Sequence, residues 1–286
     1  MDALRAGMTQ QSARVVTHRR IARDHFRLSL RCPAVARTAQ PGQFIHLRCT
    51  ADGAAVPRGG LGPSPLLRRP FSLFDVDGDR GTCDLIYKVV GVGTEALRQV
   101  DVGQSLDVLG PLGTTFTADG TTQYAVLIGG GVGIPPLYFW AKALTARGIS
   151  TEAYLGVRTE GYQICAGDFR RLGVPVQTAT DDGSVGFRGS VTDLVAHRFR
   201  RRQPSPGTTL YVCGPTPMMA AATALARRWH LPAQVSLEER MGCAMGVCMG
   251  CIVEIRGPYA TEHKRFQRVC TEGPVFTAET VVWRSQ

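Results

Sequence analysis

Four cysteines near the C-terminus constrain the fold of this chain more than any other feature of its sequence. Cys243, Cys248 and Cys251 lie in the stretch MGCAMGVCMGC, and Cys270 follows in RVCTEGP. The spacing C-x4-C-x2-C with a distant fourth cysteine is typical of one class of [2Fe–2S] site, in which two thiolates bind each iron. Glycines alternate with these cysteines and let backbone N–H groups approach the sulfurs. We therefore predict that this segment wraps around a cluster that transfers one electron at a time.

Two other interpretations of these cysteines stay open. Structural zinc usually takes paired C-x2-4-C knuckles, whereas here three cysteines share one loop and the fourth comes alone. Disulfides are disfavoured because the chain has nine cysteines, an odd number, and no secretory signal. The iron–sulfur cluster is the preferred interpretation, with zinc and structural thiols as the alternatives.

Composition indicates a soluble chain of more than one domain. With 286 residues and 44% hydrophobic content, it can bury two or three modest cores. No apolar run is long enough to span a bilayer, and the first twenty residues lack the apolar core of a signal peptide, so we expect a cytoplasmic protein without a membrane span. The net charge of +10 comes almost wholly from scattered arginines. This favours phosphate-rich cofactors or an acidic partner over nucleic acid, for which no binding module is recognisable.

The pattern of predicted strands and helices changes twice along the sequence, which predicts a multidomain β plus α/β protein. Residues 10–118 contain short β-rich runs, as in an antiparallel barrel or sandwich, interrupted by a Gly- and Pro-rich loop at Ala51–Leu67. Residues 119–233 alternate strand and helix, as in a doubly wound parallel sheet, and residues 234–286 carry the cysteines. The predicted strands are Ala13–Thr17, Phe26–Ser29, Phe44–Leu47, Phe71–Leu73, Cys83–Val90, Ser105–Leu109, Tyr124–Ile128, Ser150–Leu155, Val174–Thr178 and Leu210–Val212, and the predicted helices are Pro136–Ala146, Val191–Phe199 and Pro217–Trp229.

Three short motifs in the β-rich region suit a flavin nucleotide. In the sequence RPFS, Arg69 has a charged guanidinium that can bind a phosphate through two N–H groups. Ser72 has a hydroxyl that can hydrogen-bond the edge of a flavin ring. The sequence IYK lies in a later strand. Gly93 and Thr94 open a helix whose free N–H groups suit a pyrophosphate. Each motif alone could also have a purely structural role, as the first residues of a strand or the cap of a helix.

Two turns in the α/β region are candidates for a dinucleotide site. The sequence GGGVGIPP follows a strand directly, although it departs from the standard G-x-G-x-x-G, and CGP ends another strand of the same sheet. Open parallel sheets bind ligands at the carboxyl ends of their strands, so both turns are expected to face one crevice. The alternative for Cys213 is a buried small hydrophobic residue. The candidate residues are Gly129, Gly130, Gly131 and Gly133 in the first turn and Cys213, Gly214 and Pro215 in the second.

The order of these motifs resembles the ferredoxin–NADP reductase superfamily. RPFS, GVGT, GPLG, GGGVGIPPLY and YVCGPTPMM follow one another, and LEERMGCAMGVCMGC with RVCTEGPVF narrows the resemblance to the electron-transfer subunits of two-subunit, NAD-linked dihydroorotate dehydrogenases. The match runs from about Val15 to Phe276 and departs in the length of the Ala51–Leu67 loop and in the 18 residues between Cys251 and Cys270. It implies a β-barrel that binds FAD, an α/β domain that binds NAD(H) and a segment that binds a [2Fe–2S] cluster. The residues implied for FAD are Arg69, Pro70, Phe71, Ser72, Ile86, Tyr87, Lys88, Gly93 and Thr94, and those implied for the cluster are Cys243, Cys248, Cys251 and Cys270.

The resemblance also implies a partner. NAD(H) exchanges a hydride with FAD, and single electrons then pass through the cluster, so no side chain is expected to act as a catalytic acid or base. The electrons are expected to pass to or from an FMN-containing catalytic subunit that interconverts dihydroorotate and orotate in pyrimidine biosynthesis, in a heterotetramer with two copies of each subunit. Met241, Met245 and Met249 are candidate contacts at that interface, although loop packing also explains them.

Two other classes of protein are alternatives. One is an electron-transfer subunit of another NAD(P)H-linked oxidoreductase, such as a sulfide dehydrogenase, a hydrogenase gamma-type subunit or an oxygenase reductase. Arg158 follows a predicted strand where it could favour the 2′-phosphate of NADPH, so the sequence leaves the choice between NADH and NADPH open. The other class is a zinc-bearing binding module without redox chemistry.

Overall fold

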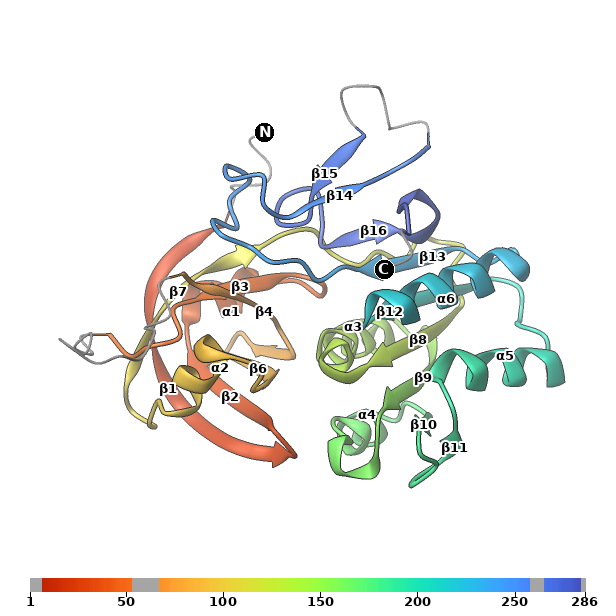
Figure 1. Cartoon of the computed structure of the whole chain (residues 1–286), viewed down its shortest axis with the longest axis horizontal. Helices are drawn as coiled ribbons and strands as arrows, with labels where there is room; N and C mark the ends of the chain where they lie inside the picture. The colour runs from red at the N-terminus through yellow and green to blue at the C-terminus, as the bar shows by residue number, and fades with distance from the viewer. Residues whose placement is uncertain (1–6, 53–66, 258–264, 284–286) are drawn as a thin grey trace.

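The computed structural model describes residues 7–52, 67–257 and 265–283, which form a β domain, an α/β domain and a C-terminal segment that covers both (Figure 1). The predicted loop Ala51–Leu67 lies almost entirely outside the described residues. None of the described helices is both long and apolar enough to cross a membrane.

The β domain is an antiparallel half-barrel of seven strands in the order β4-β3-β7-β1-β2-β6-β5, which confirms the predicted class. Apolar side chains alternate along its strands and point inward, because successive residues of a strand face opposite sides of a sheet. Leu28 and Leu30 in β2 and Leu85 in β6, for example, are completely buried in the barrel core. The elements are β1 (Thr9–Ala22), β2 (His25–Arg31), α1 (Pro33–Thr38), β3 (Phe44–Leu47), β4 (Arg69–Ser72), β5 (Asp75–Asp77), β6 (Thr82–Lys88), α2 (Val92–Arg98) and β7 (Ser105–Leu112).

The α/β domain has a seven-stranded sheet in the order β11-β10-β9-β8-β12-β13-β16, in which all pairs are parallel except β13 with β16. Helices α3 and α4 pack on one face of the sheet, and α5 and α6 on the other (Figure 1). This confirms the predicted doubly wound arrangement. The elements are β8 (Tyr124–Gly130), η1 (Gly131–Gly133), α3 (Ile134–Ala146), β9 (Ser150–Val157), η2 (Glu160–Tyr162), α4 (Ala166–Arg171), β10 (Val176–Thr180), β11 (Phe187–Arg188), α5 (Val191–Arg201), β12 (Thr208–Cys213), α6 (Thr216–Arg228), β13 (Ala233–Ser236) and β16 (Val275–Thr277).

The structure differs from the sequence prediction in several elements of this domain. The strand predicted at Val174–Thr178 is β10, which begins two residues later, because Val174 packs in the core before the strand starts. Helix α4 and strand β11 were not predicted. Strands β13 and β16 extend the α/β sheet, although their residues lie at or beyond the predicted boundary at residue 233, so the C-terminal segment is joined to the α/β domain by strand pairing.

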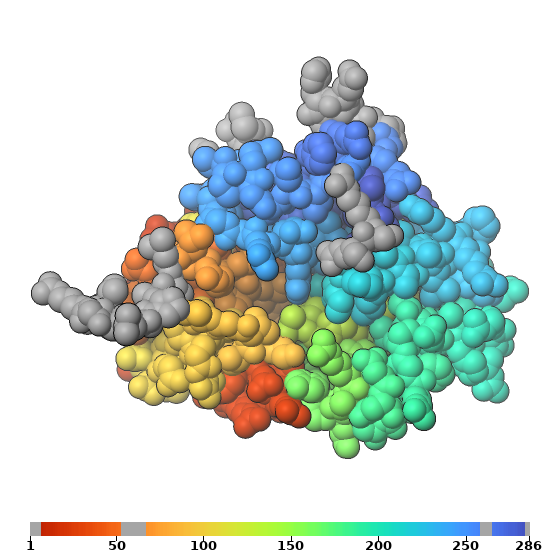
Figure 2. All heavy atoms as spheres, viewed as in Figure 1, coloured from red at the N-terminus to blue at the C-terminus, as the bar shows by residue number. Residues whose placement is uncertain are grey.

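The C-terminal segment lies across the β and α/β domains (Figure 2). It contains the hairpin β14 (Ile252–Glu254) and β15 (Phe266–Arg268), strand β16 and the single turn η3 (Ala278–Thr280). The GPLG motif holds it to the half-barrel: a Cβ at Gly113 would lie 2.5 Å from Cδ of Pro274, and the Thr114 N–H donates to the carbonyl of Gly273 at 2.7 Å. This contact explains why Gly113 must be a glycine, although the GPLG motif is far from the cysteines in sequence.

Two cysteines outside the C-terminal segment are joined in the half-barrel. Cys32, just before α1, and Cys83 in β6 form a disulfide. The odd number of cysteines predicts free thiols, and this prediction is wrong for Cys32 and Cys83. The other seven cysteines have free thiols.

Candidate functional site

The first and third flavin motifs meet through Arg69 and Gly93. A Cβ at Gly93 would lie 3.2 Å from Nε of Arg69, so the absence of a side chain in α2 lets the arginine pass over the start of this helix. Arg69 Nη1 donates to the carbonyls of Leu67 and Arg68 at 2.7 and 3.2 Å, which holds the guanidinium near the chain. A cation beside a helix N-terminus creates a positive local field that suits an anion.

Thr94 is used by the helix itself. Its hydroxyl oxygen accepts the N–H groups of Val90 and Gly91 at 2.9 and 3.2 Å and donates to the carbonyl of Gly91 at 3.0 Å. The side chain therefore closes the turn that leads into α2. Val90 is 77% exposed, so this turn projects from the half-barrel and leaves its backbone accessible.

Tyr87 is buried behind this surface. Its ring stacks on Phe26 with centroids 5.7 Å apart and meets Phe71 edge-on at 5.9 Å. Its hydroxyl lies 2.8 Å from Nε2 of His18, whose Nδ1 lies 2.8 Å from the carbonyl of Val100. Burial raises the pKa of the Tyr87 hydroxyl well above its ordinary value. The side chain is thus fixed and uncharged between Phe26 of β2 and Phe71 of β4, and His18 is part of the same network.

The two turns of the α/β domain lie against each other, as the sequence predicted. A Cβ at Gly133 would be 2.4 Å from the carbonyl carbon and oxygen of Cys213, and one at Gly130 would be 2.9 Å from Cδ of Pro215. Gly214 has a φ of +156°, and a Cβ there would lie 3.0 Å from the Cα of Gly130. Because β8 and β12 are adjacent parallel strands whose connections leave in opposite directions, these turns flank the point where ligands bind in open sheets.

Gly131 differs from the other glycines of its turn. It has a φ of +52°, and a Cβ there would meet nothing within 4 Å. This side of the turn is therefore open to a ligand, whereas Gly129, Gly130 and Gly133 are required for packing. Pro135 and Pro136 in the first turn of α3 have no N–H, so the N–H donors to a phosphate must come mainly from the turn that precedes them.

Cys213 is buried at the end of β12. Burial, assisted by the charge of Glu238, raises the pKa of its thiol above the ordinary value, so it stays uncharged. Its side chain packs as a small apolar group in the core, while its backbone carbonyl lies against Gly133.

The flavin motif and the dinucleotide turn are fixed relative to each other by aromatic stacking. Phe74, two residues after Ser72, stacks on Tyr138 of α3 with ring centroids 4.4 Å apart. The guanidinium of Arg27 lies over the Phe74 ring, 4.6 Å from its centroid, and also pairs with Asp84 and Asp168. The two domains therefore meet through a packed, charged and aromatic junction directly behind both motifs.

The four predicted ligands lie in one region of the C-terminal segment as two pairs. Cys243 and Cys248 interact through their side chains, as do Cys251 and Cys270. Among the described residues, no three potential ligands are close enough to hold a metal ion in a single shell. Two neighbouring pairs of thiols nevertheless match a donor set in which each of two irons takes two thiolates.

The loop around Cys243 is arranged to stabilise a thiolate. Its Sγ accepts the N–H groups of Met245 and Cys248, each at 3.4 Å. Burial opposes ionisation of Cys243, but the backbone N–H groups outweigh it and lower the pKa of the thiol to about 7. Burial and the neighbouring Cys251 raise the pKa of Cys270 to about 12. Ala244, Gly246 and Met249 all have positive φ, as a tightly folded loop requires.

Sequence reasoning missed Arg268, which joins the two halves of this region. Its Nη1 donates to the carbonyl of Gly246 at 2.8 Å, and its guanidinium and N–H bind both carboxylate oxygens of Glu272. The sequence carries no signal for this contact, because Gly246 and Arg268 are 22 residues apart. Arg268 thus ties the loop of the first three cysteines to the segment that holds the fourth.

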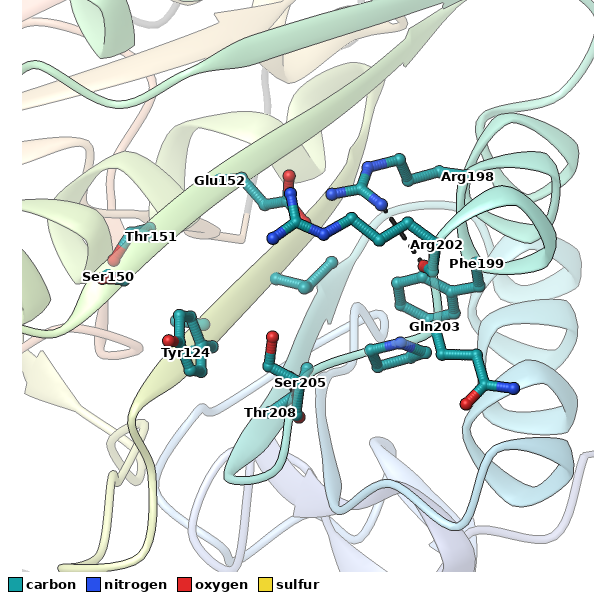
Figure 3. Close-up of a pocket in the computed structure, with 13 residues that line it drawn as sticks. Tyr124, Ser150, Thr151, Glu152, Arg198, Phe199, Arg202, Gln203, Ser205 and Thr208 are labelled. Atoms are coloured by element: carbon teal, nitrogen blue, oxygen red, sulfur yellow. Dashed lines mark hydrogen bonds between the residues drawn. The ribbon is translucent and has the colours of Figure 1, made fainter.

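The pocket in Figure 3 lies at the other end of the sheet. It has a volume of about 200 Å³ and is lined by the amino ends of β8, β9 and β12 together with Arg198 and Arg202 from the end of α5. Dinucleotides bind at the carboxyl ends of parallel strands. This pocket is therefore separate from the crevice that the two turns flank.

Together, the half-barrel, the doubly wound sheet and the cysteine segment define the class: an oxidoreductase that links FAD, NAD and an iron–sulfur cluster on a ferredoxin reductase-like fold. Family models match an oxidoreductase FAD-binding domain over residues 12–116, an oxidoreductase NAD-binding domain over residues 127–224 and the iron–sulfur cluster binding domain of dihydroorotate dehydrogenase B over residues 238–282. The chain belongs to the family of electron transfer subunits of NAD-dependent dihydroorotate dehydrogenase B.

The relatives match nearly the whole chain. The electron transfer subunit of dihydroorotate dehydrogenase B (NAD(+)) from Bacillus caldolyticus is 40% identical over 271 residues, which are 94% of this chain and 96% of the relative. The corresponding subunit from Desulforamulus reducens is 37% identical over 95% of this chain and 97% of its own. A solved structure of an NADH-dependent reduced ferredoxin-NADP oxidoreductase chain superposes with a TM-score of 0.81 at 32% identity, covering 96% of this chain and 90% of that one.

Proposed function

We propose that this chain passes electrons between NAD(H) and a separate FMN-containing subunit that interconverts dihydroorotate and orotate. The observation that carries the proposal is the juxtaposition of three sites in one chain: a flavin motif, a dinucleotide turn fixed behind it by Phe74 and Tyr138, and a loop of four cysteines beside the half-barrel. When bound, FAD supplies the conversion between a two-electron hydride and single electrons, which the cluster can carry.

We assign FAD to the surface of the half-barrel at β4 and α2. Arg69 and the first N–H groups of α2 suit the pyrophosphate, and Ser72 at the end of β4 suits the edge of the ring. A hollow of about 300 Å³ on the same side of the half-barrel is available for another part of the cofactor. The residues assigned to FAD are Arg69, Pro70, Phe71, Ser72, Ile86, Tyr87, Lys88, Gly93 and Thr94.

We assign NAD(H) to the crevice between the turns after β8 and β12. Gly131 offers the open approach to a phosphate, and the packing of Gly133 against Cys213 brings the two turns close enough to share one ligand. Since Pro135 and Pro136 lack N–H groups, α3 contributes its dipole but few donors. The residues assigned to NAD(H) are Gly129, Gly130, Gly131, Gly133, Cys213, Gly214 and Pro215.

We assign the [2Fe–2S] cluster to Cys243, Cys248, Cys251 and Cys270. The donor set fits, because Cys243 is already held by N–H groups that favour its thiolate and the other thiols lie in the same region. The division at residues 118 and 233 into FAD, NAD and cluster parts follows from these assignments, with β13 and β16 as the join between the last two.

We assign the partner's docking surface to the apolar residues around the cysteine loop. Met245, Val247 and Met249 are 47%, 75% and 49% exposed, and Ile252 and Phe266 on the adjacent hairpin are 42% and 48% exposed. Exposed apolar side chains gathered over a redox site are typical of a protein interface. A cytoplasmic heterotetramer with two copies of each subunit is the assembly we propose.

Affinity purification of this chain from its own cells, with mass spectrometry of the bound proteins, tests the proposal. An FMN-containing subunit in near-equal amount, with NADH-dependent reduction of orotate by the complex, is the expected result. Recovery of a different oxidoreductase subunit would overturn the dihydroorotate assignment while leaving the electron-transfer chemistry intact.

A second candidate is an electron-transfer subunit of another NAD(P)H-linked oxidoreductase. It is favoured by the 32% identity over 96% of this chain to the NADH-dependent reduced ferredoxin-NADP oxidoreductase chain. Arg158, directly after β9, is placed where it could meet a 2′-phosphate. The ratio of kcat/KM for NADH and NADPH, measured with an artificial acceptor, separates the nucleotide preferences.

A further inference from the structure

His46 lies between the strand assigned to flavin and the segment assigned to the cluster. It is the third residue of β3, opposite Pro70 of β4, and is 1% exposed. Along β3, Ile45 and Leu47 point into the barrel core, whereas Phe44 packs with the C-terminal segment. Because alternate residues of a strand share a face, His46 points to the side that the C-terminal segment covers.

His46 is the buried barrel histidine without a hydrogen bond. Within the described part of the chain, neither of its ring nitrogens has a partner. The other two histidines of the half-barrel are bonded: His18 through both nitrogens, and His25 through Nδ1, which lies 2.6 Å from the carbonyl of Arg23. Buried polar groups in proteins are nearly always paired, so an unpaired imidazole in a well-packed wall requires an explanation.

The backbone groups near the His46 imidazole indicate which acceptor its N–H can reach. The backbones of Arg68 and Met241 are close enough to act on its ionisation, and Met241 is two residues before Cys243. Burial, together with the positive charge of Arg68, lowers the pKa of His46 to about 4. Arg68 itself is held by an ion pair with Asp107. A neutral imidazole has one N–H to donate, and of the two backbones only that of Met241 belongs to the cysteine segment.

We propose that His46 is a positioning residue of the electron path: with the cluster bound, it donates its one N–H, unpaired in this structure, to the backbone at Met241 and so fixes the start of the cysteine loop against β4. The inference rests on the proposed function, since it requires the cluster to be held by the four cysteines. The backbone of His46 is in register with Pro70 of β4, and its side chain faces Met241, so one residue of β3 connects the strand assigned to flavin with the cysteine loop. Partners of this kind orient the groups that bind a metal and tune its surroundings.

The test uses the purified full-length protein with FAD and cluster bound. His46→Phe keeps a ring of similar shape without nitrogen, and His46→Gln keeps an N–H donor. His25→Phe is the matched control, because His25 is equally buried in the same half-barrel at 2% exposure but belongs to β2, away from the cysteine segment. The readouts are iron content, the electron paramagnetic resonance spectrum of the reduced cluster and the stopped-flow rate at which cluster absorption bleaches after NADH reduces the flavin.

We expect His46→Phe to alter the resonance spectrum and to slow bleaching about 10- to 100-fold, the usual cost of removing an outer partner of a metal site. His46→Gln should restore most of the rate, and His25→Phe should behave as the unmodified protein. A His46→Phe protein with an unchanged spectrum and rate would overturn the proposal. If that variant fails to hold FAD, His46→Gln decides: a slow, altered glutamine variant overturns the proposal, and a normal one supports it. Absence of a [2Fe–2S] signal in the unmodified protein would instead show that the proposed function fails.

Discussion

Phe74 and Tyr138 stack face to face, with ring centroids 4.4 Å apart and planes inclined by 13°. Phe74 follows the flavin motif by two residues, and Tyr138 is the last residue of the sequence GGGVGIPPLY. One contact therefore joins the flavin motif to the dinucleotide motif. Electron transfer by hydride requires the donor ring and the flavin to meet at a fixed separation. The stack is placed to maintain this separation, because Phe74 follows β4 by two residues and Tyr138 lies in α3 shortly after the glycine turn.

Replacing Phe74 with alanine should loosen this junction. Phe74 is 1% exposed, and loss of a buried phenyl ring costs about 3–5 kcal/mol of unfolding free energy. We expect NADH-dependent flavin reduction, followed by stopped-flow absorbance, to slow markedly in the folded protein. Tyr138→Phe retains the stacked ring and serves as the control. Flavin reduction at the normal rate in Phe74→Ala would show that the stack is dispensable for orientation.

Replacing Gly133 with alanine should disrupt the dinucleotide crevice. The new methyl group would lie 2.4 Å from the carbonyl of Cys213, so the two turns must separate. Overpacking of this kind costs about 1–3 kcal/mol, and the displaced turns should raise the KM for NADH. Gly120→Ala is the matched control, because a Cβ there meets nothing within 4 Å. Equal KM values for the two variants would contradict the assignment of NAD(H) to this crevice.

Replacing Cys248 with serine should block electron transfer to the partner subunit without blocking the transfer from NADH to FAD. A serine hydroxyl is a poor ligand for iron, so the cluster should be lost while FAD and NAD(H) still bind. NADH oxidation by an artificial flavin acceptor should persist, whereas reduction of the partner subunit should fall to background. Cys49→Ala, a buried cysteine of the half-barrel outside the cysteine segment, should leave both activities unchanged. Normal partner reduction by Cys248→Ser without iron would exclude the cluster from the path.

The global arrangement could be predicted because its signals are local. The glycines at Gly130 and Gly133 mark a strand-to-helix turn, and the cysteine spacing marks a cluster loop without reference to the rest of the chain. The roles of other residues depend on distant partners. Gly113 is required by Pro274, and strand β16 pairs with β13 across a gap that includes all four cysteines. Contacts of this separation leave no periodic or spacing signal, so these features emerge only in the folded structure.

The Arg69–Gly93 contact illustrates the same limit within the site. The sequence predicted both residues to line FAD, but for different reasons. Arg69 has a charged guanidinium that suits a phosphate, and Gly93 lies at the start of a helix. The structure shows that the glycine also makes room for the arginine. Conversely, the hydroxyl of Thr94 is occupied by the turn before α2, so its contribution to a ligand comes through the backbone.

The stability of the protein should fall in mild acid, in part because of His46. Burial lowers the pKa of His46 to about 4 in the folded chain, compared with about 6.5 when unfolded. Between these values the unfolded chain binds a proton that the folded chain does not, so this contribution to stability is lost as pH falls from about 6.5 towards about 4. Denaturant unfolding at pH 7 and pH 4.5 measures the loss. His46→Phe should show a smaller decrease than the unmodified protein, and an equal decrease would contradict the attribution.

Replacing Arg268 with alanine should release iron from an otherwise folded protein. Arg268 donates to the carbonyl of Gly246 and binds Glu272, so it is the side chain that holds the loop of Cys243, Cys248 and Cys251 to the segment of Cys270. Without it, the part of the loop with Cys243 and Cys248 can move away from Cys270, whereas Cys251 stays in place because the Val269 N–H donates to its carbonyl at 2.8 Å. The half-barrel and the α/β sheet keep their own cores. Outer partners of metal sites usually contribute about 10- to 100-fold to metal affinity, so the rate of iron loss to a chelator should rise by a similar factor.

Arg265→Ala provides the comparison for this last prediction. Arg265 lies three residues earlier, pairs with Glu254 across the hairpin and is 61% exposed, so its removal takes away the same charge without touching the loop at Gly246. Because this ion pair lies on the hairpin and not at the loop of Cys243 and Cys248, this variant should retain its iron. If both variants lost iron at the same rate, positive charge near the cluster would be the cause. If only Arg268→Ala lost it, the cause would be the hydrogen bond that connects the two halves of the cysteine segment, which is the outcome that the geometry predicts.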